Sequence, residues 1–367
     1  MTLPSSPQKY VLTAESDSIA VEVDDDTSTV IKITGTESSD EKSSIEIGNP
    51  MIIGNNNANQ PVNSSSLISF DDDSNGYVMA DFSTGSIHFQ NITLKSSSPS
   101  VSGIIDATFS GWPERFDLDF KIDGDLTFDN ISYISDENEN KNRHLINLYY
   151  NKEDDVIYLK VTGSTQINNT TSNSFVRSVN ATAELNNVTV NNSHFNIFLD
   201  LSGGSFKAND ISISNTEIQQ LVNASGNIFD VNSISYDGSS EGTFLSKGMN
   251  FMNFTDSSID IKKNLSIQNL NFSAYGGTSA HLIEFKNNSQ ISIGNPPTGP
   301  DEYAPDEYAI NLQNINFYAN TQVYQEYEEP IALVSFHENE FGYENEKETA
   351  RSAAGFGARG GHAADLG

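Results

Sequence analysis

The chain has 367 residues, with 50 acidic and 19 basic side chains, a net charge of −31 and no cysteine. This balance argues against nucleic-acid binding, which needs clustered Lys and Arg, and the absence of cysteine excludes disulfides, a thiol nucleophile and a Cys-ligated zinc site. Hydrophobic residues make up 36% of the chain, which is low for a compact globule. A repeat protein tolerates this because each repeat buries only a few side chains.

Residues 1–44 alternate apolar and polar residues without a repeated phrase, so we predict an N-terminal cap or irregular first rungs of a repeat fold. The first residues lack the basic start and apolar run of a secretory signal. No stretch reaches the roughly 18 apolar residues of a membrane span. We therefore expect no transmembrane segment in this chain, and we expect it to be a fragment of a longer precursor.

From residue 45 onward a short phrase recurs: apolar, any, apolar, any, Asn, apolar, any, apolar, as in IHFQNITL and LTFDNISY. Asp210 and Ser233 take the Asn position in two further copies. Several neighbouring copies stand roughly 20 residues apart, and a period of this length predicts a solenoid. The asparagines at this position are Asn49, Asn91, Asn130, Asn169, Asn187, Asn253, Asn269, Asn295 and Asn314.

The phrase has a physical explanation in a bend of the chain. Phe128 and Ile131 are three residues apart, so they would lie on opposite faces of one straight strand. A bend beside Asn130 lets both side chains face one interior, and Asn suits it because Asn tolerates the left-handed conformation. Stacked rungs would then form a ladder of Asn side chains.

Further strand-like runs at 145–150, 195–201, 281–285 and 331–336 supply a third side for each rung. We therefore predict an all-β fold, a three-sided parallel β-helix over residues 45–337 with about 20 residues per rung and Asn at a tight corner. The crossover preference of parallel strands predicts a right-handed coil.

Two segments interrupt this pattern. Residues 296–309, PPTGPDEYAPDEYA, predict an extruded Pro-rich loop, in which Tyr303 and Tyr308 are the candidate partner contacts. Apolar periodicity ends at Glu338, and the composition changes sharply in RSAAGFGARGGHAADLG. We predict that residues 338–367 are a disordered or added tail.

No catalytic, cofactor-binding or metal-binding residue is predicted, because the chain has no HExxH, nucleophile elbow, phosphate loop or dinucleotide fingerprint. Acid clusters such as Asp71 to Asp73 could hold calcium or be solvated turns. Paired carboxylates on neighbouring rungs could hydrolyse a glycosidic bond. Trp112, beside Arg115, could stack on a sugar or anchor a turn.

The Asn-cornered phrase, the absence of cysteine and the acidic Ser/Thr/Asn-rich composition resemble the right-handed β-helix of autotransporter passenger domains from Gram-negative bacteria, either adhesins or vacuolating-cytotoxin-like passengers. The resemblance covers residues 45–337 and lies in architecture and repeat style. It implies export across the outer membrane and work at the bacterial cell surface or outside the cell. The implied partner is a protein or glycan on a host or neighbouring cell.

Three function classes follow. The first is an adhesive or structural surface rod that makes its contacts through outward Ser, Thr, Asn and Tyr side chains. The second is a β-helical carbohydrate-active enzyme or phage tailspike, which needs a groove with acids and aromatics on successive rungs. The third is a scaffold that self-associates through exposed sheet edges at the rod ends.

Overall fold

A computed structural model gives the fold. It describes residues 9–12, 18–23, 29–34, 43–55, 62, 64, 66–71, 76–82, 85–95, 102–109, 116–134, 143–150, 157–238, 243–244, 250–274, 281–293, 310–319 and 334–337.

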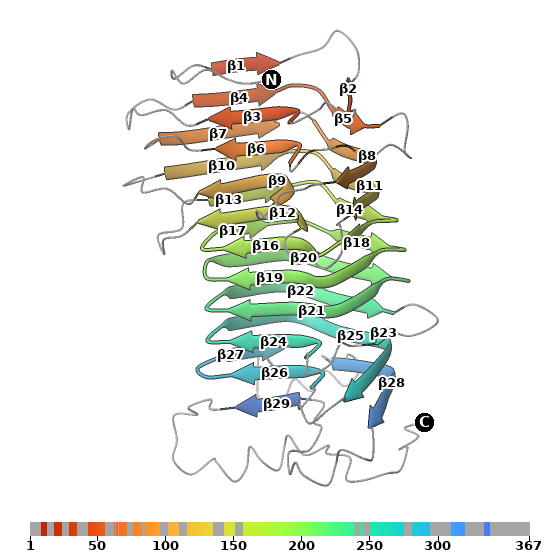
Figure 1. Cartoon of the computed structure of the whole chain (residues 1–367). Helices are drawn as coiled ribbons and strands as arrows, with labels where there is room; N and C mark the ends of the chain where they lie inside the picture. The colour runs from red at the N-terminus through yellow and green to blue at the C-terminus, as the bar shows by residue number, and fades with distance from the viewer. Residues whose placement is uncertain are drawn as a thin grey trace.

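The described residues form 29 strands and no helix, and the paired strands all run parallel. Accordingly, this part of the chain has no helix that is long and apolar enough to cross a membrane. The strands stack into three sheets that surround one interior, and colour runs from red at one end of the stack to blue at the other (Figure 1). The fold is a parallel β-helix, as the repeat predicts.

Sheet 1 consists of β1 (Lys9–Leu12), β4 (Ser43–Ile47), β7 (Gly76–Phe82), β10 (Phe116–Ile122), β13 (Ile157–Val161), β17 (Thr182–Glu184), the first parts of β20 (Ser205–Ser214), β22 (Ile228–Asp237) and β25 (Ser258–Ala274), and β27 (Gln290–Ile293).

Sheet 2 consists of β2 (Ile19–Glu22), β5 (Met51–Gly54), β8 (Ile87–Lys95), β11 (Leu126–Ile134), β14 (Thr165–Asn168), β18 (Val188–Asn191), the later parts of β20, β22 and β25, and β28 (Ile310–Ala319).

Sheet 3 consists of β3 (Ile31–Thr34), β6 (Ile68–Asp71), β9 (Ser102–Phe109), β12 (Arg143–Tyr150), β16 (Ser174–Val179), β19 (His194–Ser202), β21 (Glu217–Ser225), β24 (Met252–Thr255), β26 (Ile283–Lys286) and β29 (Val334–His337). Two short strands lie in the connections between the sheets: β15 (Thr171–Ser172) pairs with the end of β11 and the start of β19, and β23 (Thr243–Phe244) pairs with β25.

The described strands make ten turns, each passing through sheets 1, 2 and 3 in that order. The first turn is built from β1, β2 and β3, so the described part of residues 1–44 pairs in register with the next turn. In Figure 1 the nearer strands, such as β19 and β21, point left and the farther strands, such as β1 and β4, point right as the chain descends. This is a right-handed coil.

The number of residues per turn is not constant. Thr170 and Ser193 bond across successive turns and are 23 residues apart, as are Ser193 and Thr216. Asp125 and Ser164, which also bond across successive turns, are 39 residues apart. The predicted rung of about 20 residues is therefore too short. Asn91 and Asn130 are also 39 residues apart and bond across successive turns, so this step in the repeat is one turn with a long connection and not two rungs.

The interior is filled by one inward side chain from every second strand residue, and like residues stack on like. Phe89 lies on Phe128 with ring centroids 5.3 Å apart and an angle of 9° between the ring planes, and Phe206 lies on Phe229 at 5.7 Å and 15°. Where the chain enters sheet 3, two successive residues are buried. The pairs are Val30–Ile31, Leu67–Ile68, Ile104–Ile105, Leu145–Ile146, Phe175–Val176, Phe198–Leu199, Leu221–Val222, Phe251–Met252 and Leu282–Ile283.

This double burial marks a bend in the strand. In β21 both Leu221 and Val222 donate their backbone N–H to the carbonyl oxygen of Phe251, at 2.7 and 3.3 Å. One partner therefore faces two residues, which is the geometry of a β-bulge and turns the strand enough to keep both side chains inside. Because each turn repeats the bend, the three sheets keep their positions along the whole stack, and their outer faces become long columns of side chains.

Candidate functional site

A column of left-handed residues follows sheet 2. Asn91, Asn130, Asn169 and Asn269, four of the predicted corner residues, have φ of 54°, 55°, 49° and 55°. The Asn130 side-chain amide donates to Oδ1 of Asn91 at 2.9 Å. The left-handed conformation bends the chain without a glycine, because the Asn side chain tolerates it. This corner fixes one edge of the outer face of sheet 2.

Other predicted corner residues lie elsewhere. Asn187 and Asn49 lie between sheets 1 and 2, Asn253 is inside β24 on the outer side of sheet 3, and none of these three has a positive φ. Asn314 lies in β28, in register with Asn269. Asn295 is outside the described residues.

Asp210 and Ser233, which take the Asn position in the sequence phrase, are in register with Asn187 rather than with Asn169. The Asn209 amide donates to Oδ1 of Asn187 at 2.9 Å, and the Ser233 hydroxyl donates to Oδ1 of Asp210 at 2.5 Å. The same phrase therefore marks two different corners: one before sheet 2 and one after it.

The sequence phrase missed two members of the left-handed column, Asn192 (φ 49°) and Asn215 (φ 46°). At Asn91 the next residue is an inward Ile, but after Asn192 and Asn215 the next residues are Ser193 and Thr216. The spacing would have found them, because Asn215 follows Asn192 by 23 residues, which is the length of a turn in this part of the chain.

A second left-handed column connects sheet 3 to sheet 1. It has no common residue type, because Gly and Asp serve as well as Asn where φ is positive. Its members are Asn180 (φ 48°), Gly203 (φ 66°), Gly226 (φ 61°), Asp256 (φ 48°) and Asn287 (φ 54°). The repeated sequence phrase does not mark this corner.

The outer face of sheet 2, which we call the polar face, consists of two columns of side chains. The first column is Ala20, Ile52, His88, Thr127, Gln166, Thr189, Ser212, Ser235, Ser266 and Asn311; the second is Glu22, Gly54, Gln90, Asp129, Asn168, Asn191, Ser214, Asp237, Gln268 and Gln313. Three of these twenty residues are charged, all of them acidic, and none is Lys, Arg, Phe, Tyr or Trp.

The middle of the polar face presents free hydrogen-bonding groups. Gln166, Thr189, Ser212 and Ser235 stand in register on successive turns and are exposed. Their side chains make no hydrogen bond or ion pair with the rest of the described structure. Adjacent strands lie about 4.8 Å apart, so these groups form a regular row of unused donors and acceptors.

The outer face of sheet 1 is different, because charged side chains there bind one another across turns. Tyr158 donates to Glu184 at 2.5 Å and Lys160 donates to the same carboxylate at 2.7 Å. The bond from Lys160, and to a smaller extent the bond from Tyr158, holds the pKa of Glu184 below its usual value. The bond to Glu184 raises the pKa of Lys160, and partial burial together with the Glu184 contact raises the pKa of Tyr158. These groups are therefore occupied with each other.

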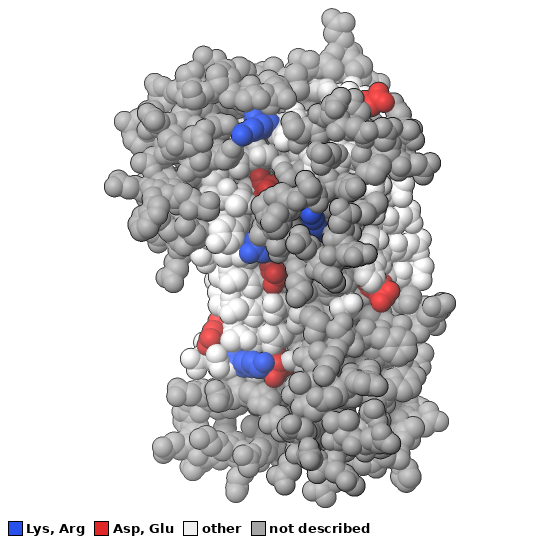
Figure 2. Space-filling view, in the orientation of Figure 1, with Lys and Arg blue, Asp and Glu red and all other residues white. Residues whose placement is uncertain are grey.

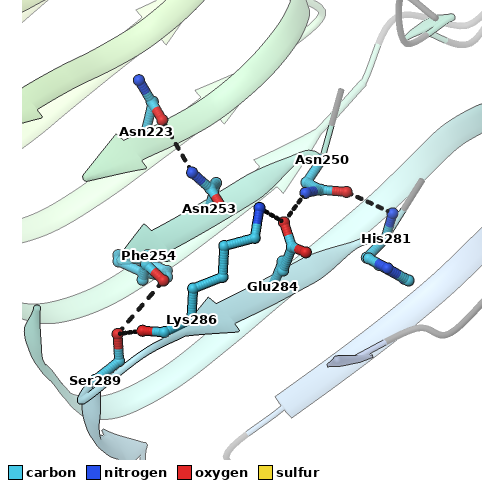
Figure 3. A network of polar contacts seen from close by, with 8 residues as sticks. All are labelled: Asn223, Asn250, Asn253, Phe254, His281, Glu284, Lys286 and Ser289. Carbon is cyan, nitrogen blue, oxygen red and sulfur yellow. Dashed lines mark hydrogen bonds and ion pairs between the residues drawn. The ribbon is translucent and has the colours of Figure 1, made fainter. Parts of the chain in front are cut away.

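The outer face of sheet 3 also carries side-chain ladders. In Figure 3, Asn253 donates to Oδ1 of Asn223 at 3.1 Å, while Glu284 accepts from Asn250 and pairs with Lys286 at 2.8 Å. The space-filling view from this side shows blue and red side chains close together on the described surface (Figure 2). At the right margin, beside β14 and β18 in Figure 1, the described surface is mainly uncoloured.

A buried His–Ser pair lies at the start of β12 and β16. Nδ1 of His144 is 2.6 Å from the hydroxyl oxygen of Ser174. Burial, followed by the charges of Arg177 and Arg143, lowers the pKa of His144 to about 3. Ser174 is 0% exposed, so no substrate can reach its hydroxyl. The pair acts as part of the packed interior, not as a nucleophile and its base.

On sheet 1 the carboxylates of Glu184 and Asp230 each contact a lysine. Asp230 and Asp260 are neighbours across turns, but Lys262 is 2.6 Å from Asp230. A general acid in glycoside hydrolysis needs a raised pKa, whereas the pKa of Glu184 is lowered. No group of three or more His, Asp or Glu side chains among the described residues could hold a metal ion.

Tyr303 and Tyr308, the predicted partner contacts, lie outside the described residues, as do Trp112, Arg115, the whole loop 296–309 and the tail 338–367.

The chain matches no protein-family model, and no curated protein or solved structure matches it. Its class is therefore defined by its own architecture: a right-handed parallel β-helix with an Asn corner and a polar face that carries few charges.

Proposed function

We propose that this chain is a rod segment of a bacterial cell-surface or secreted protein, similar to an autotransporter passenger, and that it works by adhesive contact with a host or neighbouring cell. The observation that carries the proposal is the polar face, where the exposed side chains of Gln166, Thr189, Ser212 and Ser235 on successive turns form no hydrogen bond with any other described residue. Groups without internal partners on a rigid, flat surface are available to a partner.

The β-helix supports a contact function mechanically. Each turn binds only its neighbours, so successive turns repeat the polar face, and its exposed row of Gln166, Thr189, Ser212 and Ser235 crosses four of the ten described turns. The strong net negative charge of −31 keeps such rods apart in solution. A short-range contact through a polar face with few charges is consistent with both properties.

The experiment is a binding assay of the full chain on cultured host cells and on bacterial cells, read by fluorescence of a labelled protein. Saturable binding that unlabelled chain competes away supports the proposal. The absence of saturable binding to either kind of cell would overturn it. In parallel, release of reducing ends from a panel of polysaccharides would favour the carbohydrate-active enzyme alternative over the adhesive rod.

A deletion of residues 296–309 in the same assay tests the predicted loop. Loss of cell binding in this variant, with an unchanged circular dichroism spectrum, would assign the contact to the loop that holds Tyr303 and Tyr308. Unchanged binding would leave the contact with the rod itself.

A further inference from the structure

We propose that the polar face binds an extended, uncharged, hydroxyl-rich polysaccharide chain that runs along the axis of the rod. This inference rests on the proposed adhesive function and names the ligand class of that site. It starts from the row of Thr127, Gln166, Thr189, Ser212 and Ser235, which crosses five turns. With strands about 4.8 Å apart, this row is about 19 Å long, which is enough for several consecutive sugar units.

The charges of the face select against charged polymers. The polar face has no Lys or Arg in its two columns, and its charged members are Glu22, Asp129 and Asp237. An anionic glycan, a nucleic acid or an anionic membrane would be repelled by a chain of net charge −31. A cationic partner would find denser acidic groups on sheet 1, for example the neighbours Asp230 and Asp260.

The side-chain types select against a protein or a lipid surface. Protein interfaces are anchored by Trp, Tyr and Arg in closely packed contacts, and none of these residues is present in the two columns of the polar face. A membrane surface would need a contiguous apolar patch, whereas Ile52 is the one large aliphatic residue in these columns.

The hydroxyl and amide groups complement a sugar chain. Ser and Thr hydroxyls each donate and accept, and the Gln166 amide does both, so the row can match sugar hydroxyls in either role. Each such bond contributes little because it replaces a bond to water. Contacts on successive turns act together on one long ligand, so binding should strengthen with polysaccharide length.

The test uses two matched variants of the full chain. Ser212→Lys/Ser235→Lys places two long side chains on the polar face, at exposed serines that are neighbours across turns. Ser202→Lys/Ser225→Lys makes the same change in charge and size at exposed neighbouring serines of sheet 3. Both variants should keep the wild-type circular dichroism spectrum and thermal unfolding midpoint, because all four positions are exposed.

Binding is measured by depletion on dextran, mannan and cellulose, with polygalacturonate as the anionic comparison. We expect the wild type to bind at least one uncharged polysaccharide, with little change at about 1 M salt, where charge interactions are screened. The Ser212→Lys/Ser235→Lys variant should bind about tenfold more weakly, because it blocks contacts on two adjacent turns. The sheet 3 variant should bind as the wild type does.

Three results of the binding assay would overturn the inference: no binding of the wild type to any uncharged polysaccharide, equal loss of binding in both variants, or preference for polygalacturonate. Sedimentation provides a further test. If the wild type is a dimer and the Ser212→Lys/Ser235→Lys variant is a monomer, the polar face binds a second copy of the chain, and the inference is overturned. If the chain binds cells but no uncharged polysaccharide, this inference fails while the adhesive function stands; if it binds neither, both fail.

Discussion

Replacing Asn169 by alanine should destabilise the β-helix through the backbone of one corner. Asn169 has φ of 49°, is exposed, and its side chain forms no hydrogen bond with another described residue. The substitution therefore removes mainly the tolerance of Asn for the left-handed conformation, which costs an ordinary L-residue about 1–2 kcal/mol. We expect Asn169→Ala to lower the free energy of unfolding by about this amount, measured as a shift of the urea midpoint by circular dichroism.

The neighbouring residue provides the control. Asn168 is the same residue type, one position earlier at the end of β14, and it does not have a positive φ. Asn168→Ala should change the free energy of unfolding by no more than about 0.5 kcal/mol. Asn169→Gly should stay close to the wild type, because glycine adopts positive φ readily. Equal losses for Asn168→Ala and Asn169→Ala, or a loss for Asn169→Gly as large as for Asn169→Ala, would refute the argument.

Three further predictions concern the interior and the second corner. Burial lowers the pKa of His144 to about 3, so on acidification the unfolded chain binds a proton at this residue before the folded chain does. The free energy of unfolding should therefore fall as the pH drops from about 6.5 towards 3, by at most about 1.4 kcal/mol per pH unit. Urea midpoints at pH 7 and pH 5 should differ less in His144→Gln than in the wild type, and an equal difference would contradict this. Gly204→Ala should be more destabilising than Gly226→Ala in thermal unfolding, by about 1–3 kcal/mol. Both glycines have a positive φ, but of the two only Gly204 would place the new Cβ against a backbone oxygen, at 2.2 Å. Similar losses of stability in the two variants would refute this clash. Phe198→Ala, which empties a fully buried site against Phe175 and Phe195, should cost about 3–5 kcal/mol in urea unfolding, and a loss below about 1 kcal/mol would show that the core collapses around the gap.

The regular part of the coil was the easiest to predict from the sequence. In LTFDNISY the alternation of Leu126 and Phe128 and the change of phase after Asn130 specify two strands and a bend, and the structure places β11 and a left-handed Asn there. These signals are local, because strand period and Asn backbone preference depend on adjacent residues. They therefore gave the fold class without knowledge of any pairing.

The pairing of strands was harder to predict. The same phrase around Asn187 marks the corner before sheet 2, whereas around Asn130 it marks the corner after it. Which strand lies next to which depends on long-range contacts, and connections of unequal length hide them. Leu126 pairs with Thr165, and Thr165 pairs with Val188, although the first connection is much longer than the second. The rung length and the second left-handed corner were missed for this reason.

The polar face, too, could not be predicted from the sequence and became visible only in the structure. Its members are ordinary Ser, Thr and Gln residues with no motif, and Ser225 has the same type and exposure as Ser235. Only the register shows that Thr189, Ser212 and Ser235 stand in one row on sheet 2, while the charged residues of sheets 1 and 3 are used in pairs.

By itself, the sequence determined the all-β class, the parallel β-helix and the absence of cysteine chemistry, because composition, strand period and the conformational preference of Asn act on neighbouring residues. The tertiary structure decided the register, and with it the length of each turn, the identity of the corner residues and the sorting of outward side chains into two faces with paired charges and one polar face with few charges. Register is a property of strands that meet only after the chain has made a full turn, so no local pattern contains it.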